Sequence, residues 1–182
     1  MTQPRIVCIA GAIGSGKTTV STAVSRALGW SRAGFGDYVR WIASKRGLDQ
    51  SRKVLQRIGE EEINGQGWDG FCAGLLNWSG WTPGQPMVLD GLRHAEILHS
   101  LRRIVAPMSA SLVFLRVGEV SRAMRLAERD DQSGMRSEVA ANSTEVQVQT
   151  ILQNAANLCV DAERPYEAIV EAVINWLGDG NT

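Results

Sequence analysis

The 182-residue sequence is poor in the residues that build disulfides and metal sites, with three cysteines and two histidines. The cysteines are Cys8, Cys72 and Cys159, and no two of them form a CxxC pair. We therefore expect three buried thiols in a reducing compartment. Because only His94 and His99 could supply an imidazole, the composition also argues against a structural zinc site.

An excess of charge of either sign is also missing, since 19 basic side chains balance 19 acidic ones. Broad nucleic-acid binding needs a basic excess or a concentrated basic face, so this balance argues against a nucleic-acid partner. The apolar run near the N-terminus is too short for a signal peptide, and no stretch approaches the length of a membrane span. We expect a cytoplasmic protein without a membrane partner.

Short apolar runs alternate along the chain with segments whose apolar residues recur at the helical period, within a length that suits one domain. Strands are predicted at about 5–10, 30–35, 87–90, 112–117 and 156–160. Helices are predicted at about 17–28, 38–46, 51–64, 68–78, 95–103, 119–129 and 166–177. We expect a polar break at 130–134, and residues 135–150 are expected to be partly helical. This alternation predicts an α/β fold with a mostly parallel sheet covered by helices on both faces.

The most specific motif is GAIGSGKT at Gly11 to Thr18, a full match to GxxxxGK[ST] between a predicted strand and a predicted helix. Glycines let successive N–H groups point at one anion, and the helix N-terminus adds partial positive charge. Lys17 is expected to reach the β- and γ-phosphates, and the Thr18 hydroxyl to coordinate Mg²⁺. The motif predicts a three-layer P-loop NTPase fold that binds ATP with Mg²⁺. Its expected nucleotide-binding residues are Gly11, Ala12, Ile13, Gly14, Ser15, Gly16, Lys17, Thr18 and Thr19.

A second acidic element follows the predicted strand at residues 87–90, whose last residue is Asp90. A carboxylate at the C-terminal end of a parallel strand lies beside the phosphate crevice of such folds. Asp90 is therefore a candidate for the magnesium shell. The alternative is a turn aspartate in front of Gly91.

Three further segments, in this order, are GDYVR at 36–40, DGLR at 90–93 and RLAER at 125–129. With the P-loop they make residues 5–130 resemble the nucleoside-monophosphate-kinase-like branch of P-loop proteins, which includes adenylate, deoxynucleoside-monophosphate and dephospho-CoA kinases. The resemblance implies one kinase-like domain over residues 1–182, with acceptor-binding helices at about 37–80 and a short lid at about 122–136. It also implies that Arg40 and Arg93 bind the acceptor.

Phosphoryl transfer spreads negative charge over the transferred group, so a kinase needs cations around it. Arg122, Arg125 and Arg129 recur at i, i+3 and i+7 on the helix expected from Glu119. We expect Arg125 and Arg129 to act as catalytic residues that close over the donor, although a solvated basic face is the alternative. The opposite face should pack on the sheet through an apolar stripe of Val120, Ala123, Met124 and Ala127.

Asp37 has two possible roles at the start of the acceptor region. If the acceptor is a hydroxyl, Asp37 accepts its proton as a catalytic base. If the acceptor is already a phosphate, no base is needed and Asp37 caps a helix. The alternative for Arg40 and Arg93 is that both are ordinary surface arginines. If Arg93 does belong to the site, we also expect it to contribute to catalysis.

Taken together, the motifs predict an ATP-dependent kinase that phosphorylates a small molecule, with a nucleotide or nucleotide-like acceptor as the leading hypothesis. One alternative is a kinase of the dephospho-CoA type that phosphorylates a sugar hydroxyl. Another is a P-loop ATPase or nucleotide-gated binding protein without a small acceptor. Stimulation of ATP turnover by small acceptors distinguishes the kinases from the last class.

Overall fold

The structure is a computed structural model that describes residues 5–133 and 143–179. Side chains are described for residues 5–128 and 149–179. The predicted lid residues 134–136 and the segment 137–142 lie outside the described residues, as does the side chain of Arg129.

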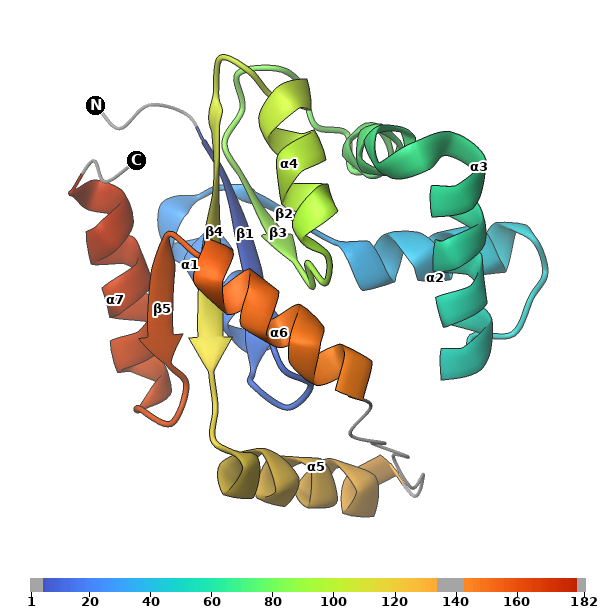
Figure 1. The fold of residues 1–182 in the computed structure, drawn as a ribbon. Helices are drawn as coiled ribbons and strands as arrows, with labels where there is room; N and C mark the ends of the chain where they lie inside the picture. Colours follow the sequence, from blue (N-terminus) through green and yellow to red (C-terminus); the bar gives the residue numbers. More distant parts are fainter. Residues whose placement is uncertain (1–4, 134–142, 180–182) are drawn as a thin grey trace.

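Five parallel strands form one sheet in the order β2–β3–β1–β4–β5 (Figure 1). The strands are β1 (Arg5–Gly11), β2 (Ser31–Gly34), β3 (Met87–Asp90), β4 (Ser109–Arg116) and β5 (Leu158–Asp161). Strand β1 lies at the centre, and its residues 5–10 are buried, as an apolar run in a parallel sheet covered on both faces requires. The prediction of a parallel α/β sheet is confirmed.

Seven helices connect or follow these strands in the described part of the chain. They are α1 (Lys17–Leu28), α2 (Phe35–Lys45), α3 (Arg52–Trp78), α4 (Ala95–Ile104), α5 (Glu119–Ser133), α6 (Ser143–Ala155) and α7 (Tyr166–Gly178). The backbone of α3 breaks at Gly67, whose φ of 72° and ψ of 176° are not helical, so the two helices predicted here are both present. Searched over the described residues, no helix combines the length and apolar character that a membrane crossing requires.

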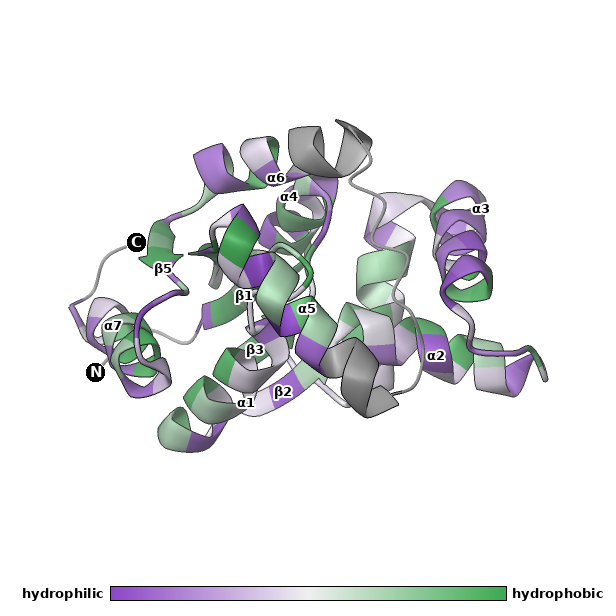
Figure 2. Ribbon diagram, turned by 90° about the horizontal axis from the view of Figure 1, so that it is seen from below, coloured by the Kyte–Doolittle hydropathy of each residue, from purple (hydrophilic) through white to green (hydrophobic). Residues whose placement is uncertain are grey.

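The strands divide the core between two helical layers, because alternate side chains point to opposite faces of the sheet. Ile6 and Cys8 of β1 join a core that includes residues of α3, α4 and α6. Val7 and Ile9 join a second core with residues of α1 and α7. Viewed along the sheet, α1 and α7 lie on one side, α4 and α6 lie on the other, and α5 crosses the end (Figure 2). The prediction of a three-layer P-loop fold is confirmed.

Two predictions about α5 are wrong. The helix continues through Ser133 rather than ending at a polar break after Arg129, because the sequence Asp-Asp-Gln that follows contains no glycine or proline to stop it. The apolar stripe does not pack on the sheet, since Val120 is 75% and Met124 is 61% exposed. The helix lies across the sheet's end, where its arginine-bearing face meets the P-loop instead.

Two local expectations also differ from the structure. Helix α2 begins at Phe35, so Asp37 lies inside its first turn and Gly34 occupies the N-cap position. Asp37 is therefore not the cap of this helix, although a carboxylate in the first turn still suits the helix dipole. Cys159 is exposed because β5 is an edge strand, whereas Cys8 and Cys72 are buried as expected.

Candidate active site

The P-loop is held in a tight turn between β1 and α1. The Ser15 amide donates to the Ala12 carbonyl at 3.1 Å, and α1 follows from Gly16, whose φ of 83° suits glycine. Gly11 has no room for a side chain, because a Cβ there would lie 2.6 Å from the Leu115 carbonyl oxygen. The turn therefore brings the loop against β4 at the carboxyl end of the sheet.

Lys17 folds back over this loop from the first turn of α1. Its Nζ donates to the carbonyl oxygens of Gly11 at 2.9 Å and Ala12 at 2.7 Å. These contacts hold the ammonium group beside the loop, where a bound phosphate would also lie. The first turn of α1 contains no acidic residue, so no carboxylate within that turn offsets its attraction for an anion.

Three further hydroxyl groups belong to this loop and the start of α1. The Ser15 hydroxyl is buried and has no hydrogen-bond partner among the described residues. Thr18 and Thr19 have exposed side chains at the start of α1. A triphosphate with its Mg²⁺ fits this donor set, since it would supply a partner for the serine and a ligand position for Thr18.

Asp90 ends β3 next to the P-loop strand, because its register partner on β1 is Ile9. The residue is 6% exposed, and its Oδ2 accepts a hydrogen bond from Arg32 Nη2 at 2.8 Å. Its Oδ1 is buried and has no partner in the part of the chain that the structure describes. An oxygen of this kind fits a role in the shell of a nucleotide-bound Mg²⁺ ion.

Asp37 lies at the mouth of the same region, beyond the carboxyl end of β2. Its Oδ1 accepts a hydrogen bond from Arg40 Nη1 at 2.9 Å, and its Oδ2 lies 3.9 Å from Arg32 Nη1. The carboxylate rests beside Gly34, where a Cβ would lie 2.6 Å from Oδ2. Because the Asp37 side chain is 47% exposed, a molecule entering the site can reach it.

Arg93 follows β3 in the loop that leads to α4, and its side chain is exposed. The next residue, His94, packs its ring against Trp68 with centroids 5.1 Å apart. The pKa of His94 is lowered, chiefly by burial of the ring; Glu96 opposes the shift and Arg93 adds to it. The lowered pKa favours the neutral imidazole, so the positive charge of this loop comes mainly from Arg93.

Helix α5 is anchored to the P-loop and to the turn after β5. A Cβ on Gly14 would lie 3.4 Å from the side chains of Arg122 and Leu126. Arg125 Nη2 donates to the Ala162 carbonyl at 2.7 Å, and its Nη1 lies 3.4 Å from the Gly14 carbonyl oxygen. Arg125 thus joins two loops that border the phosphate site.

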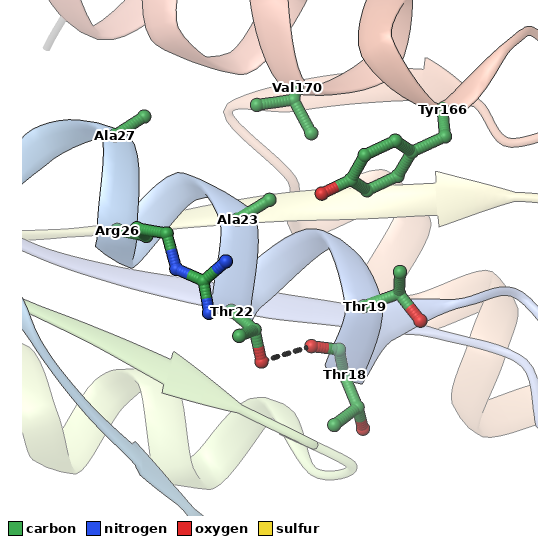
Figure 3. Close-up of a pocket in the computed structure, with 8 residues that line it drawn as sticks. All are labelled: Thr18, Thr19, Thr22, Ala23, Arg26, Ala27, Tyr166 and Val170. Carbon is green, nitrogen blue, oxygen red and sulfur yellow. Dashed lines mark hydrogen bonds between the residues drawn. The ribbon is translucent and has the colours of Figure 1, made fainter.

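A groove of about 570 Å³ runs between α1 and α7 (Figure 3). The Tyr166 ring reaches from α7 towards α1, and Thr22 Oγ1 donates to the Thr18 carbonyl at 2.7 Å. The groove meets the P-loop at Thr18 and Thr19 and then follows α1 as far as Arg26 and Ala27. Its lining residues are Thr18, Thr19, Thr22, Ala23, Arg26, Ala27, Tyr166 and Val170.

No cluster of three or more His, Cys, Asp or Glu side chains that could hold a metal ion alone exists within residues 5–128 and 149–179. Mg²⁺ does not need such a cluster, because it is usually held by one or two protein oxygens together with substrate phosphates. Thr18 and Asp90 are the side chains that the sequence predicts for this part.

The structure brings most of the predicted residues to the carboxyl end of the sheet. They comprise the P-loop, Asp37, Arg40, Asp90, Arg93 and Arg125. Sequence reasoning missed Arg32, which contacts both aspartates, and Ser21, whose hydroxyl accepts from Arg32 Nε at 2.9 Å. The only sequence signal for Arg32 was a charged residue in a strand-like segment. Its contact with Asp90 could not be predicted without knowing that β2 and β3 are neighbours.

Comparisons with known proteins identify the family of the chain and similar folds. Residues 7–149 match the model of a family described as an AAA domain. The chain is 26% identical to shikimate kinase 2 of Yersinia enterocolitica over 186 residues, covering 98% of each chain. Among solved structures, a gluconokinase from Sinorhizobium meliloti has a TM-score of 0.61 at 19% identity, covering 100% of this chain and 95% of that one. Shikimate kinase from Aquifex aeolicus has a TM-score of 0.61 at 17% identity, covering 97% of both chains. The shared fold is that of P-loop kinases.

Proposed function

The chain belongs to the AAA-domain family of P-loop proteins, and from this premise we propose that it is an ATP-dependent kinase that phosphorylates a hydroxyl group of a small molecule. The observation that carries the proposal is the accessible carboxylate of Asp37. It forms an ion pair with Arg32, which also pairs with Asp90 beside the P-loop.

The donor side uses the P-loop. Its amides and the N-terminus of α1 bind the triphosphate, and Lys17 exchanges its two carbonyl partners for phosphate oxygens. When bound, Mg²⁺ neutralises charge on the β- and γ-phosphates. Thr18 and Asp90 Oδ1, which has no hydrogen-bond partner among the described residues, would orient the ion's shell, while Arg125 holds Gly14 and the turn after β5 together.

On the acceptor side, the Asp37 carboxylate lies where we expect the attacking group of the acceptor to bind. A carboxylate accepts the proton of an attacking hydroxyl, whereas it repels a phosphate that is already ionised. Asp37 is therefore the base in this proposal, and Arg40 and Arg93 bind an anionic part of the acceptor. The names of two similar proteins, shikimate kinase and gluconokinase, support a small hydroxyl-bearing acid as the acceptor class.

A nucleotide acceptor, the leading hypothesis from the sequence motifs, stays a prediction. The aromatic cluster beside Asp37 supports it, because Tyr38 stacks on Trp41 with centroids 6.0 Å apart and Trp41 is 41% exposed. An exposed indole can stack on a base. The lid role of α5 and the acceptor role of residues 37–80 are likewise part of the proposal.

The test is ATP turnover by the purified protein with a panel of acceptors: hydroxy acids, sugars, nucleosides and nucleoside monophosphates. Strong stimulation by a hydroxyl-bearing molecule is expected, with loss of the stimulation in Asp37→Asn. Stimulation by nucleoside monophosphates alone would support the nucleotide hypothesis and contradict the hydroxyl proposal. Turnover that no small molecule stimulates would contradict both and favour an ATPase or nucleotide-gated protein.

A further inference from the structure

Arg32 lies at the centre of the polar contacts between the donor and acceptor sides. On β2 it pairs in register with Val88 of β3, and both therefore point to the face that α1 covers. Its guanidinium uses separate nitrogens for separate partners: Nε donates to Ser21 Oγ at 2.9 Å and Nη2 donates to Asp90 Oδ2 at 2.8 Å. The third nitrogen, Nη1, lies 3.9 Å from Asp37 Oδ2.

The contact with Ser21 extends this chain to the P-loop helix. The Ser21 hydroxyl is fully buried, accepts from Arg32 and donates to the Thr18 carbonyl at 3.0 Å. The Asp90 carboxylate is thus joined through Arg32 and Ser21 to the main-chain carbonyl of Thr18 in the first turn of α1. Side chains that hold ligands in place in this way determine ligand orientation in metal sites.

Arg32 is the partner of the buried Asp90 carboxylate. A buried carboxylate without a partner is costly, and the guanidinium supplies both charge and a hydrogen bond to Oδ2. With Oδ2 occupied, Oδ1 is the oxygen left without a partner among the described residues. Arg32 therefore selects which oxygen of Asp90 can face an ion.

We propose that Arg32 is a positioning residue: it fixes the Asp90 carboxylate for the nucleotide-bound magnesium ion, braces the first turn of α1 through the Ser21 hydroxyl, and forms a longer ion pair with Asp37. This inference rests on the proposed function, which identifies the ion as Mg²⁺ and the base as Asp37. The role depends on the planar guanidinium group of arginine, whose three nitrogens contact Ser21, Asp90 and Asp37 separately.

The test measures ADP binding by calorimetry across a range of Mg²⁺ concentrations, with parent, Arg32→Met and Arg32→Gln proteins. Loss of a residue that orients metal ligands typically costs about 10–100-fold in metal affinity. The Mg²⁺ concentration for half-maximal tightening of ADP binding should rise by about this factor in both variants. ADP affinity in EDTA should stay near the parent value. Arg103→Met, which removes an exposed arginine paired with Asp69 far along α4, is the matched control and should behave like the parent.

A residue that only stabilised the fold would lower the unfolding temperature without changing the Mg²⁺ dependence, and that result would overturn the proposal. The Gln variant keeps polar packing, so the measurement remains possible if the Met variant does not fold. Because ADP binding needs no acceptor, this result is independent of the acceptor panel. Failure of the panel would contradict the proposed kinase activity, whereas an unchanged Mg²⁺ dependence would contradict the role of Arg32.

Discussion

Replacing Arg125 by alanine tests how α5 is attached to the P-loop. The substitution removes a charged donor to the Ala162 carbonyl at 2.7 Å and a longer contact of 3.4 Å to the Gly14 carbonyl. A hydrogen bond from a charged group contributes about 1.5–3 kcal/mol when well formed. The longer contact adds little, and partial exposure of the arginine reduces the total, so a loss of about 1–2 kcal/mol is expected.

For a chain of this size, 1 kcal/mol corresponds to about 2–4 °C in Tm. Thermal unfolding of nucleotide-free Arg125→Ala, followed by circular dichroism, should therefore show a Tm about 2–8 °C below the parent. The matched variant is Arg122→Ala, because Arg122 shares the helix face but its side chain packs on Gly14 through methylene groups. Its Tm should fall less than that of Arg125→Ala.

The kinetic part of the same prediction concerns the transferring phosphoryl group. If Arg125 only anchors the loop, ATP affinity falls; if it also stabilises the transition state, kcat falls more than KM changes. We expect the second pattern. Equal unfolding temperatures and equal turnover of parent and Arg125→Ala would refute the reasoning, because neither an anchor nor a catalytic arginine behaves in that way.

Three further substitutions address the site directly. Lys17→Ala should lower triphosphate turnover by about 10²–10³-fold, the usual effect of removing one group that stabilises developing charge, and turnover at the parent rate would contradict this role. Asp90→Asn should raise the Mg²⁺ concentration needed for half-maximal turnover by about tenfold or more while ADP binding in EDTA is retained, and an unchanged Mg²⁺ response would exclude Asp90 from the shell. Arg40→Ala and Arg93→Ala should each raise the acceptor KM by about 10–100-fold, as expected for a lost charged hydrogen bond, whereas an equal loss of ATP affinity would place them on the donor side.

The sequence was sufficient to predict the fold and the donor loop because both depend on local signals. The P-loop motif lies between an apolar strand and an amphipathic helix, and Asp90 ends an apolar strand. Each of these features is set by neighbours within a few residues. The alternation of strands and helices predicts a parallel sheet, but the strand order and the register that pairs Gly34 with Asp90 are visible only in the structure.

The contacts that the sequence did not predict are long-range. Arg32 and Asp90 are 58 residues apart, and Arg125 and Gly14 are 111 residues apart. The face of α5 was also predicted wrongly, because an apolar period normally indicates the side that packs on a sheet. Here the helix crosses the end of the sheet, so its arginine face meets the P-loop while Val120 and Met124 stay exposed.

In the proposed reaction, a hydroxyl group of the acceptor attacks the γ-phosphate with Asp37 as the base. The most direct measurement is phosphorus NMR of the product formed from ATP and the best acceptor of the panel, with parent and Asp37→Asn proteins. We expect a phosphate monoester formed in step with ADP, at a rate about 10²–10⁴-fold lower in Asp37→Asn, the range that general-base catalysis supplies. A phosphoanhydride product, free phosphate as the only product, or an unchanged rate in Asp37→Asn would contradict the proposed reaction.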